Sequence, residues 1–218
     1  MPNIGTNGGA ISGFGSSTVV DSIHIADVTT AQAAVDLNNA YNQLMLLPNT
    51  VTGHTPAFGL GETITTGVYD IGGAGSLAGD ITLDGLGDPN AIFVMRFAGA
   101  FNAGAGSKII LSNGAKRCNV YWLGGAGVAT GAITIGANSI VKGNFISHGG
   151  ACNSGSGTFL AGRQLSTLGA IGTSAGIIYT DPKCVSSSAL PIELVSFTTT
   201  VKKGLIHINW ATAAEIKN

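Results

Sequence analysis

The feature of this sequence that most constrains its fold is a short phrase that recurs at a fixed distance. Gly131-Ala132-Ile133-Thr134 returns at residues 150–153 and again at residues 169–172, each copy beginning 19 residues after the one before. A second phrase, residues 143–147, recurs at residues 162–166 with the same spacing of 19. A repeat of this length with glycine-marked corners is typical of a β-solenoid, in which each coil stacks on the next.

The repeated phrase also predicts which side chains face solvent. Neighbouring side chains of a strand point to opposite faces, so the apolar third residue of each copy points into the core. Related phrases occur at residues 9–12, 75–78 and 99–102. The predicted outward positions are Ala10, Ser12, Ser76, Ala78, Ala100, Asn102, Ala132, Thr134, Ala151, Asn153, Ala170 and Gly172. Three threonines near strand ends, Thr130, Thr167 and Thr173, are further candidates for the same face.

None of these outward positions is charged. The strands of another side carry Asp84, Lys108 and Lys142, so charge is tolerated elsewhere in the repeat. Any solenoid places small residues outside and branched residues inside, and that alternative explanation stays open at this point. An uncharged stripe of methyl, hydroxyl and amide groups is nevertheless unusual for a solvated surface. It indicates a binding face.

One segment has helical rather than strand periodicity. Apolar residues at Ala34, Leu37, Tyr41 and Leu44 follow one another in steps of 3, 4 and 3. This spacing predicts an amphipathic helix over about residues 30–47, with Thr29 or Thr30 as its N-cap. We expect its apolar stripe to pack on one flank of the solenoid, against strands that are apolar on both faces, at residues 91–95 and 120–123.

Composition excludes several classes of partner. The 218 residues have a net charge of −1, and 10% of them are charged, so the sequence lacks the basic field that binds nucleic acid. No run of 18 apolar residues predicts a membrane span. The three cysteines leave one unpaired. Cys152 occupies an inward position and is expected to be a buried apolar residue, while any disulfide pairing with Cys118 or Cys184 stays open.

The repeat also suggests the domain boundaries. We assign residues 1–182 to the solenoid, which begins within a coil, so that an N-terminal truncation is expected. Residues 183–189 read as a linker. Residues 190–218 contain two apparent strands of a different kind and are expected to be a fragment of a separate β module.

The sequence contains no catalytic constellation, and we predict neither an enzyme nor a cofactor or metal site. Polysaccharide-cleaving solenoids need clustered carboxylates. The one acidic cluster, Asp80, Asp84 and Asp88, is explained by turns. The four histidines, His24, His54, His148 and His207, lack the paired spacing of metal ligands.

Several stretches between residues 4 and 180 match one known family in order. They are Gly5-Thr6-Asn7-Gly8-Gly9-Ala10-Ile11, Thr30-Ala31-Gln32-Ala33-Ala34-Val35-Asp36-Leu37, Thr66-Gly67-Val68-Tyr69, residues 83–93, Cys118-Asn119-Val120-Tyr121-Trp122 and Gly162-Arg163-Gln164-Leu165-Ser166-Thr167. On these stretches the chain resembles the microbial ice-binding proteins of the DUF3494 type. The resemblance implies a right-handed, discontinuous, triangular β-solenoid with a helix alongside. It also implies that one flat face binds ice, and we expect a monomer.

The C-terminal residues resemble a second, unrelated element. Leu190–Phe197 and Asn209–Glu215 are similar to the module that precedes type IX sorting signals in Bacteroidetes. This resemblance implies export and an extracellular protein. The alternative function is an exported adhesive or structural solenoid that binds carbohydrate or another surface.

Overall fold

The computed structural model describes residues 4–12, 22–127, 131–180, 194–202 and 205–212, and for the last two ranges we describe the backbone only. The chain divides into two compact units, Met1–Pro182 and Lys183–Asn218.

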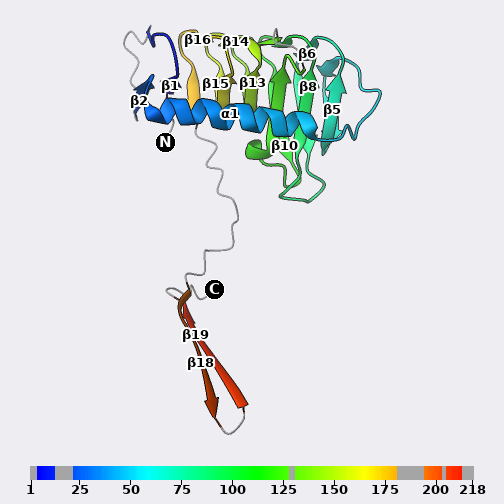
Figure 1. The fold of residues 1–218 in the computed structure, drawn as a ribbon. Coiled ribbons are helices and arrows are strands. Elements are labelled where there is room, and N and C mark those ends of the chain that lie inside the picture. Colours follow the sequence, from blue (N-terminus) through cyan, green and yellow to red (C-terminus); the bar gives the residue numbers. More distant parts are fainter. Residues whose placement is uncertain (1–3, 13–21, 128–130, 181–193, 203–204, 213–218) are drawn as a thin grey trace. The chain divides into compact units, whose positions relative to one another are not determined.

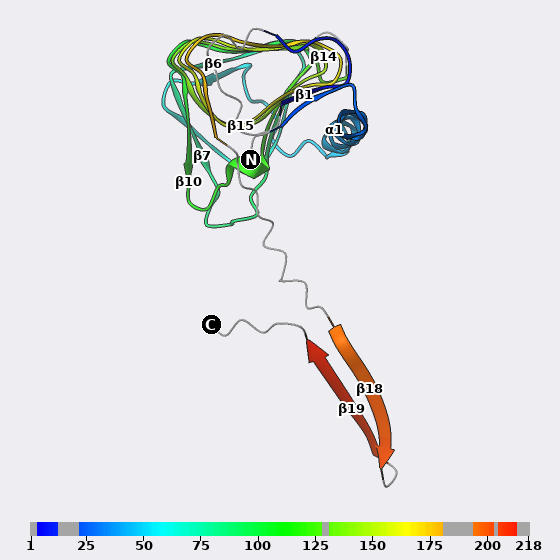
Figure 2. The ribbon, with the colours of Figure 1, turned by 90° about the vertical axis from the view of Figure 1, so that its left-hand side faces the viewer.

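The first unit is a stack of short parallel strands that form a triangular solenoid (Figures 1 and 2). Its strands are β1 (Ile4–Thr6), β2 (Ile23–Ile25), β3 (Ala57–Gly59), β4 (Glu62–Thr65), β5 (Gly67–Ile71), β6 (Gly75–Ala78), β7 (Asp80–Asp84), β8 (Phe93–Phe97), β9 (Phe101–Ala103), β10 (Lys108–Ser112), β11 (Val120–Gly124), β12 (Gly131–Ile135), β13 (Ile140–Ser147), β14 (Gly149–Ser154), β15 (Phe159–Ser166), β16 (Ile171–Thr173) and β17 (Ile178–Thr180). The predicted mostly-β solenoid with one long helix is confirmed.

Two sheets make the three sides of the triangle. The six-stranded face has the order β16-β14-β12-β9-β6-β3. The nine-stranded sheet bends, because the long strands β13 and β15 each contribute to two sides. Their first halves join β4, β7, β10 and β17 in what we call the third face, and their second halves join β5, β8 and β11 in the helix face. β1 and β2 form a parallel pair of their own.

The interior of the solenoid is filled by aromatic and branched side chains in stacked columns. Phe101 stacks on Phe97 with ring centroids 4.7 Å apart and on Trp122 with centroids 4.9 Å apart. Trp122 in turn stacks on Phe145 at 6.1 Å, and all four rings are fully buried. Close packing of such large rings leaves the interior of the stack little room to rearrange.

The helix α1 (Val28–Leu46) runs along the helix face and carries the chain from one end of the stack to the other (Figure 1). Tyr41 is buried in a cluster with Val68, Val94, Leu123 and Ile146. The helix therefore packs on β5, β8, β11 and β13, as the apolar stripe predicted. After α1, the chain winds back along the stack, and the coils from β3 to β16 lie next to one another in sequence order.

The ends of α1 differ from the prediction by a few residues. Asp27, rather than Thr29 or Thr30, is the N-cap, and its side chain accepts a hydrogen bond from the amide of Thr30. The Thr30 hydroxyl in turn accepts from the amide of Asp27, which completes a capping box. The Asp27 carboxylate is a charged hydrogen-bond acceptor at the positive end of the helix dipole, so the helix begins at Val28, before either threonine could act as the N-cap.

The C-terminal end of α1 is fixed by a buried cation from the helix face. The Arg96 side chain, 4% exposed, donates to the main-chain oxygens of Met45 and Leu47 at 3.0 Å each. It also pairs with Asp70 at 3.0 Å. The last turn of α1 has no basic residue of its own, so Arg96 supplies the positive charge that the carbonyl end of the helix favours.

The corners of the triangle are built in two ways. At Thr66 the ladder is interrupted, and β4 ends and β5 begins where the chain turns from one side of the triangle to the next. At Gly143 the strand β13 continues through the corner. The φ of +119° at Gly143 lets the chain bend there without ending the ladder.

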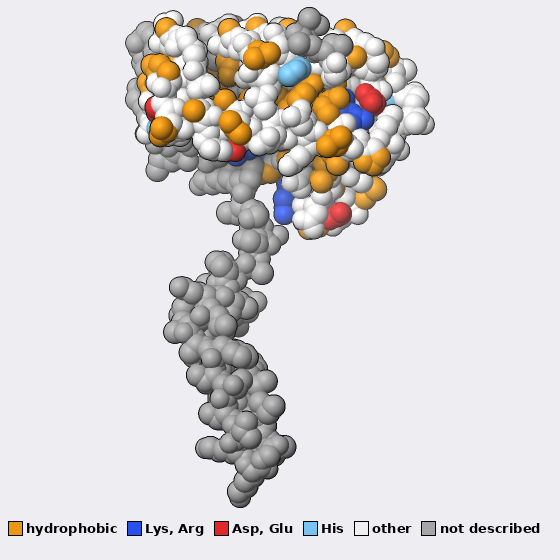
Figure 3. Space-filling view, in the orientation of Figure 1, with side chains coloured by type: hydrophobic (Ala, Val, Ile, Leu, Met, Phe, Trp, Pro, Cys, Tyr) orange, Lys and Arg blue, Asp and Glu red, His pale blue; other side chains and the backbone are white. Residues whose placement is uncertain are grey.

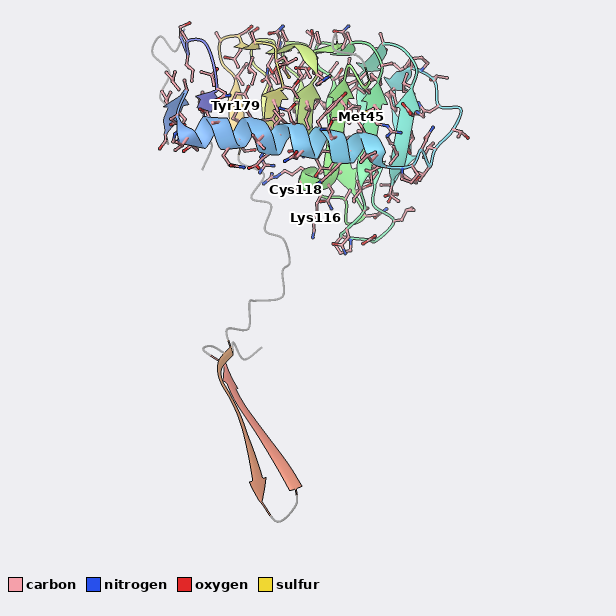
Figure 4. All side chains as sticks on the ribbon, in the orientation of Figure 1. Met45, Lys116, Cys118 and Tyr179 are labelled. Atoms are coloured by element: carbon pink, nitrogen blue, oxygen red, sulfur yellow. The ribbon has the colours of Figure 1, made fainter. Side chains whose placement is uncertain are left out.

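The two cysteines that the structure describes differ in their bonding. Cys152 is free and fully buried, as expected from its inward position. Cys118, labelled in Figure 4, belongs to the short 3-10 helix η1 (Arg117–Asn119) and is disulfide-bonded. Cys184 lies outside the described residues.

The second unit contains an antiparallel pair, β18 (Leu194–Lys202) and β19 (Leu205–Thr212). Phe197 pairs with Trp210 in this ladder. The expected strand at residues 190–194 lies almost wholly outside the described residues. Within the described chain, no helix combines the length and apolar composition that crossing a bilayer requires.

Candidate functional site

The register of the six-stranded face places one residue of each coil in a single outward column. In the ladder Ser76 pairs with Asn102, Asn102 with Thr134, and Thr134 with Asn153. Ala57 and Gly172 continue the column at its two ends. We call these six residues the polar column. Ser76, Asn102, Thr134 and Asn153 are all exposed, whereas their strand neighbours Leu77, Phe101, Ile133 and Cys152 are buried.

A second outward column runs beside the first and consists of alanine only. Each member comes directly before an inward residue of the ladder, and these inward residues pair with one another from strand to strand: Gly75, Phe101, Ile133, Cys152 and Ile171. The members are Ala74, Ala100, Ala132, Ala151 and Ala170, and we call them the alanine column. Each is exposed or half-buried. The face thus presents a row of methyl groups parallel to a row that has hydroxyl or amide groups at its four middle positions.

Neither column contains a charged residue, and parallel ladders repeat at roughly 4.8 Å. Figure 2 shows this sheet as one straight side of the triangle, with α1 lying outside a different side. The third face differs in chemistry, because Asp80 pairs there with Lys108, and Ile110 and Ile140 are 40% exposed. The six-stranded face therefore differs from the third face in its outward side chains, which are short and uncharged.

One irregularity interrupts the face near the corner that it shares with the helix face. Gly131 pairs with Gly149 while Ile133 pairs with Cys152, so β14 has one extra residue opposite β12. This is a β-bulge. The carbonyl oxygen of Gly150 accepts hydrogen bonds from the hydroxyls of Ser147 at 2.8 Å and Ser166 at 3.1 Å. The two serines satisfy a main-chain oxygen at the point where the ladder is disturbed.

The structure does not gather every predicted residue on the two columns. Ala78 lies beyond the polar column at the end of β6, because Ser76 and not Ala78 pairs with Asn102. Thr173 is in register with the buried Ser154 and so occupies an inward position of the terminal coil, where it is itself exposed. The Thr167 hydroxyl lies 2.9 Å from Nδ1 of His148 at the corner. Ala10 and Ser12 are exposed in the segment after β1, and Thr130 lies outside the described residues.

Two members of the columns were missed by sequence reasoning. Ala74 was missed because residue similarity aligns Gly75-Ser76-Leu77-Ala78 with Gly131-Ala132-Ile133-Thr134. In the ladder, Ser76 is instead in the column of Thr134, so that alignment is wrong by two residues. The true register follows from packing. Gly75 occupies an inward position, where a Cβ would lie 2.1 Å from Cε1 of Phe97. Ala57 was missed because Pro56-Ala57-Phe58-Gly59 lacks the first glycine of the phrase, although it precedes Ser76 by the same 19 residues.

Two aspartates of the acidic cluster and two of the histidines make structural contacts. Asp84 accepts from the amide of Leu86, and Asp88 accepts from the amide of Asn90, as expected for turn residues. His24 pairs with Asp27 and His54 pairs with Glu62. Burial raises the pKa of the Cys152 thiol to about 12, which leaves it protonated and unreactive at neutral pH. In the part of the chain that the structure describes, no three His, Cys, Asp or Glu side chains gather as metal ligands.

The chain is a β-solenoid that presents an uncharged, two-column face to solvent. The chain belongs to the family of ice-binding-like proteins, whose pattern matches residues 2–178. This span takes in the solenoid and α1.

Relatives of known description support this membership. The chain is 34% identical over 142 residues to an ice-binding protein of a Nostoc strain, which covers 65% of this chain and 50% of the relative. It is 38% identical over 117 residues to ice-binding protein 1 of Shewanella frigidimarina, covering 52% of this chain and 13% of that protein. The chain thus spans about half the length, or less, of these two curated relatives.

Solved structures show the same fold. An ice-binding protein from the Antarctic ascomycete Antarctomyces psychrotrophicus superposes with a TM-score of 0.73 at 32% identity, over 82% of this chain and 85% of that one. An ice-binding protein from an Antarctic bacterium of the Flavobacteriaceae gives a TM-score of 0.72 at 36% identity, over 85% of this chain and 42% of that one.

Proposed function

We propose that this protein adsorbs to ice through the six-stranded face and thereby inhibits ice growth and recrystallisation. The observation that carries the proposal is the register of that face, which holds a row of methyls beside a row of hydroxyls and amides. Family membership supports it, because the relatives named above are described as ice-binding proteins.

The mechanism follows from the rigidity of the columns. Backbone ladders on both sides fix each outward Cα, and short side chains such as Ala, Ser and Thr lose little rotamer entropy when they are held at a surface. Hydroxyl and amide groups bind ordered water, while methyl groups favour its release or caging. Each contact is weak, but contacts on one rigid plane act together, as linked binding sites do. Protein held at the crystal surface then blocks the advance of the growing front.

The face argues against carbohydrate binding, the alternative function. Sugar grooves are commonly lined by aromatic rings that stack on the ligand. Trp122 is fully buried in the core, and Tyr121 packs in the cluster beneath α1. The polar column and the alanine column contain no aromatic residue.

We further propose that the protein is exported and acts outside the cell as a monomer. The disulfide at Cys118 supports export, because disulfides persist in oxidising compartments. The C-terminal resemblance to a sorting-associated module supports it as well. The low charge visible on the side that carries α1 (Figure 3) gives no sign of a nucleic-acid partner.

The test is the partition of the purified, dye-labelled protein into a slowly grown ice hemisphere. We expect enrichment in the ice relative to labelled serum albumin, and no retention on insoluble cellulose or chitin. Exclusion from the ice together with retention on a polysaccharide would replace this proposal with the carbohydrate-binding alternative.

A further inference from the structure

A histidine lies where the helix face meets the six-stranded face. The imidazole of His148 stacks on the ring of Tyr41 from α1, with centroids 4.3 Å apart and planes inclined by 13°. Its Nδ1 lies 2.9 Å from the hydroxyl of Thr167 on the next coil. The side chain is thus held on one side by the helix and on the other by a neighbouring coil.

The main chain of His148 joins two parts of the same corner. Its amide donates to the carbonyl of Gly124 at 2.9 Å, and its carbonyl accepts from the amide of Gly131 at 3.2 Å. The bond with Gly131 belongs to an isolated antiparallel bridge between Gly131 and His148, inside a stack of parallel strands. Gly131 directly precedes Ala132, so the bridge fixes the chain at the point where β12 enters the alanine column.

Tyr41 ties the same corner to the helix. Its hydroxyl donates to the carbonyl of Gly125 and accepts from the amide of Gly127, both at 3.1 Å. A Cβ on Gly131 would lie 1.7 Å from the nitrogen of Gly125, so these turns are packed backbone against backbone. Movement of the Tyr41 hydroxyl would therefore be transmitted to Gly131 through main-chain contact.

The bulge lies on the other side of His148. Residues 149–151 follow His148 directly and contain the extra residue of β14. They end at Ala151, the next member of the alanine column. The position of Ala151 relative to Ala132 therefore depends on how the chain leaves His148.

We infer that His148, held between Tyr41 and Thr167, is a positioning residue for the six-stranded face. The two side-chain contacts of His148 described above, with Tyr41 and Thr167, lie outside both columns. His148 instead sets the relative positions of Ala132 and Ala151, and so the match between the alanine column and an ice plane. This inference rests on the proposed function.

The test compares three substitutions in the full chain. His148→Ala removes the stack and the contact with Thr167. Tyr41→Phe leaves the stack and removes the hydroxyl that joins Gly125 and Gly127. The matched control is Leu37→Ala, which removes a partly buried side chain of the same helix cluster and leaves the hydrogen bonds and the ring stack of Tyr41 and His148 in place. Stability, the ice-bound fraction near the melting point, and amide hydrogen exchange at Gly131 are measured for each variant.

We expect His148→Ala to lower the ice-bound fraction about fivefold and Tyr41→Phe about twofold, on the scale of one lost hydrogen bond. Both variants should speed exchange at Gly131. Leu37→Ala should bind ice like the wild type even if it costs more stability. The inference is overturned if His148→Ala and Tyr41→Phe keep full ice binding, or if Leu37→Ala loses as much as they do. Failure of the proposed function would be seen separately, as exclusion of the wild-type protein from ice.

Discussion

Thr134 on β12 and Asn153 on β14 are directly paired in the parallel ladder, and both side chains are exposed. Their neighbours Ile133 and Cys152 are equally paired and fully buried. In both strands, therefore, successive side chains alternate between the core and the solvent, and they do so in the same register. This alternation lets a packed interior hold a hydroxyl and an amide about 4.8 Å apart with little freedom to move.

A charge in the polar column should weaken ice binding without unfolding the protein. Asn102→Asp changes one amide into a carboxylate of nearly the same shape, and the carboxylate holds its own hydration shell strongly. We expect the ice-bound fraction to fall about tenfold, the equivalent of about 1.4 kcal/mol. Ice affinity and urea unfolding are measured together.

The control for that substitution is Asn138→Asp. Asn138 is exposed in the turn after β12, where φ is +56°, a conformation that Asp also tolerates. It lies outside both columns. Equal losses for the two variants would show that net charge, and not the face, determines ice affinity.

Arg96 should dominate the attachment of α1 to the solenoid. Arg96→Met leaves part-buried main-chain oxygens at the end of the helix without this donor, and we expect it to lower the free energy of unfolding by about 3 kcal/mol. Asp70→Asn removes the other partner of Arg96, but the Asp70 side chain is 46% exposed. Its cost should be about 1 kcal/mol or less. Urea denaturation measures both, and a larger loss for Asp70→Asn would refute the assignment of Arg96 as the helix anchor.

The buried thiol and phenol near the last coils predict a loss of stability in alkali. Burial raises the pKa of Cys152 from 9.0 to about 12, and that of Tyr179 from 10.0 to about 12. Above pH 9 the unfolded chain loses these protons while the folded protein keeps them. The free energy of unfolding should therefore be unaffected by these groups below pH 9 and fall as the pH rises toward about 12.

Urea unfolding at about pH 8 and about pH 10.5 measures this effect. The matched variant is Cys152→Ala with Tyr179→Phe, which removes both groups and should show a shallower fall. An equally steep fall in this variant would assign the alkaline instability to other residues.

The sequence predicted the solenoid because its repeat is regular where the coils are regular. From Thr134 to Asn153 and from Asn153 to Gly172 the column advances by 19 residues each time. Between Ser76 and Asn102 the ladder advances by 26 residues, so matching by letters placed Ala78 beside Asn102. The ring of Phe97 decides the true register, and its position over Gly75 is a tertiary contact that periodicity does not reveal.

Other features depended on contacts between distant residues. The stripe through Leu37 and Tyr41 predicted a helix and the flank that it covers, because a helix needs an apolar partner. Helical periodicity could not predict that Arg96 binds the C-terminal end of α1, because Arg96 belongs to a strand about 50 residues later in the sequence. It also could not place Thr167 beside His148, since that contact depends on how two corners stack.

The most direct test of the central claim is the ice-bound fraction of Thr134→Tyr and Asn153→Tyr beside Thr82→Tyr. Thr82 is half-buried on the third face, so its substitution adds the same bulk to a different side of the triangle. We expect the first two variants to fold like the wild type and to be excluded from a growing ice hemisphere. We expect Thr82→Tyr to be incorporated as the wild type is. Full incorporation of Thr134→Tyr and Asn153→Tyr, with exclusion of Thr82→Tyr, would move the ice-binding surface to the third face and contradict this account.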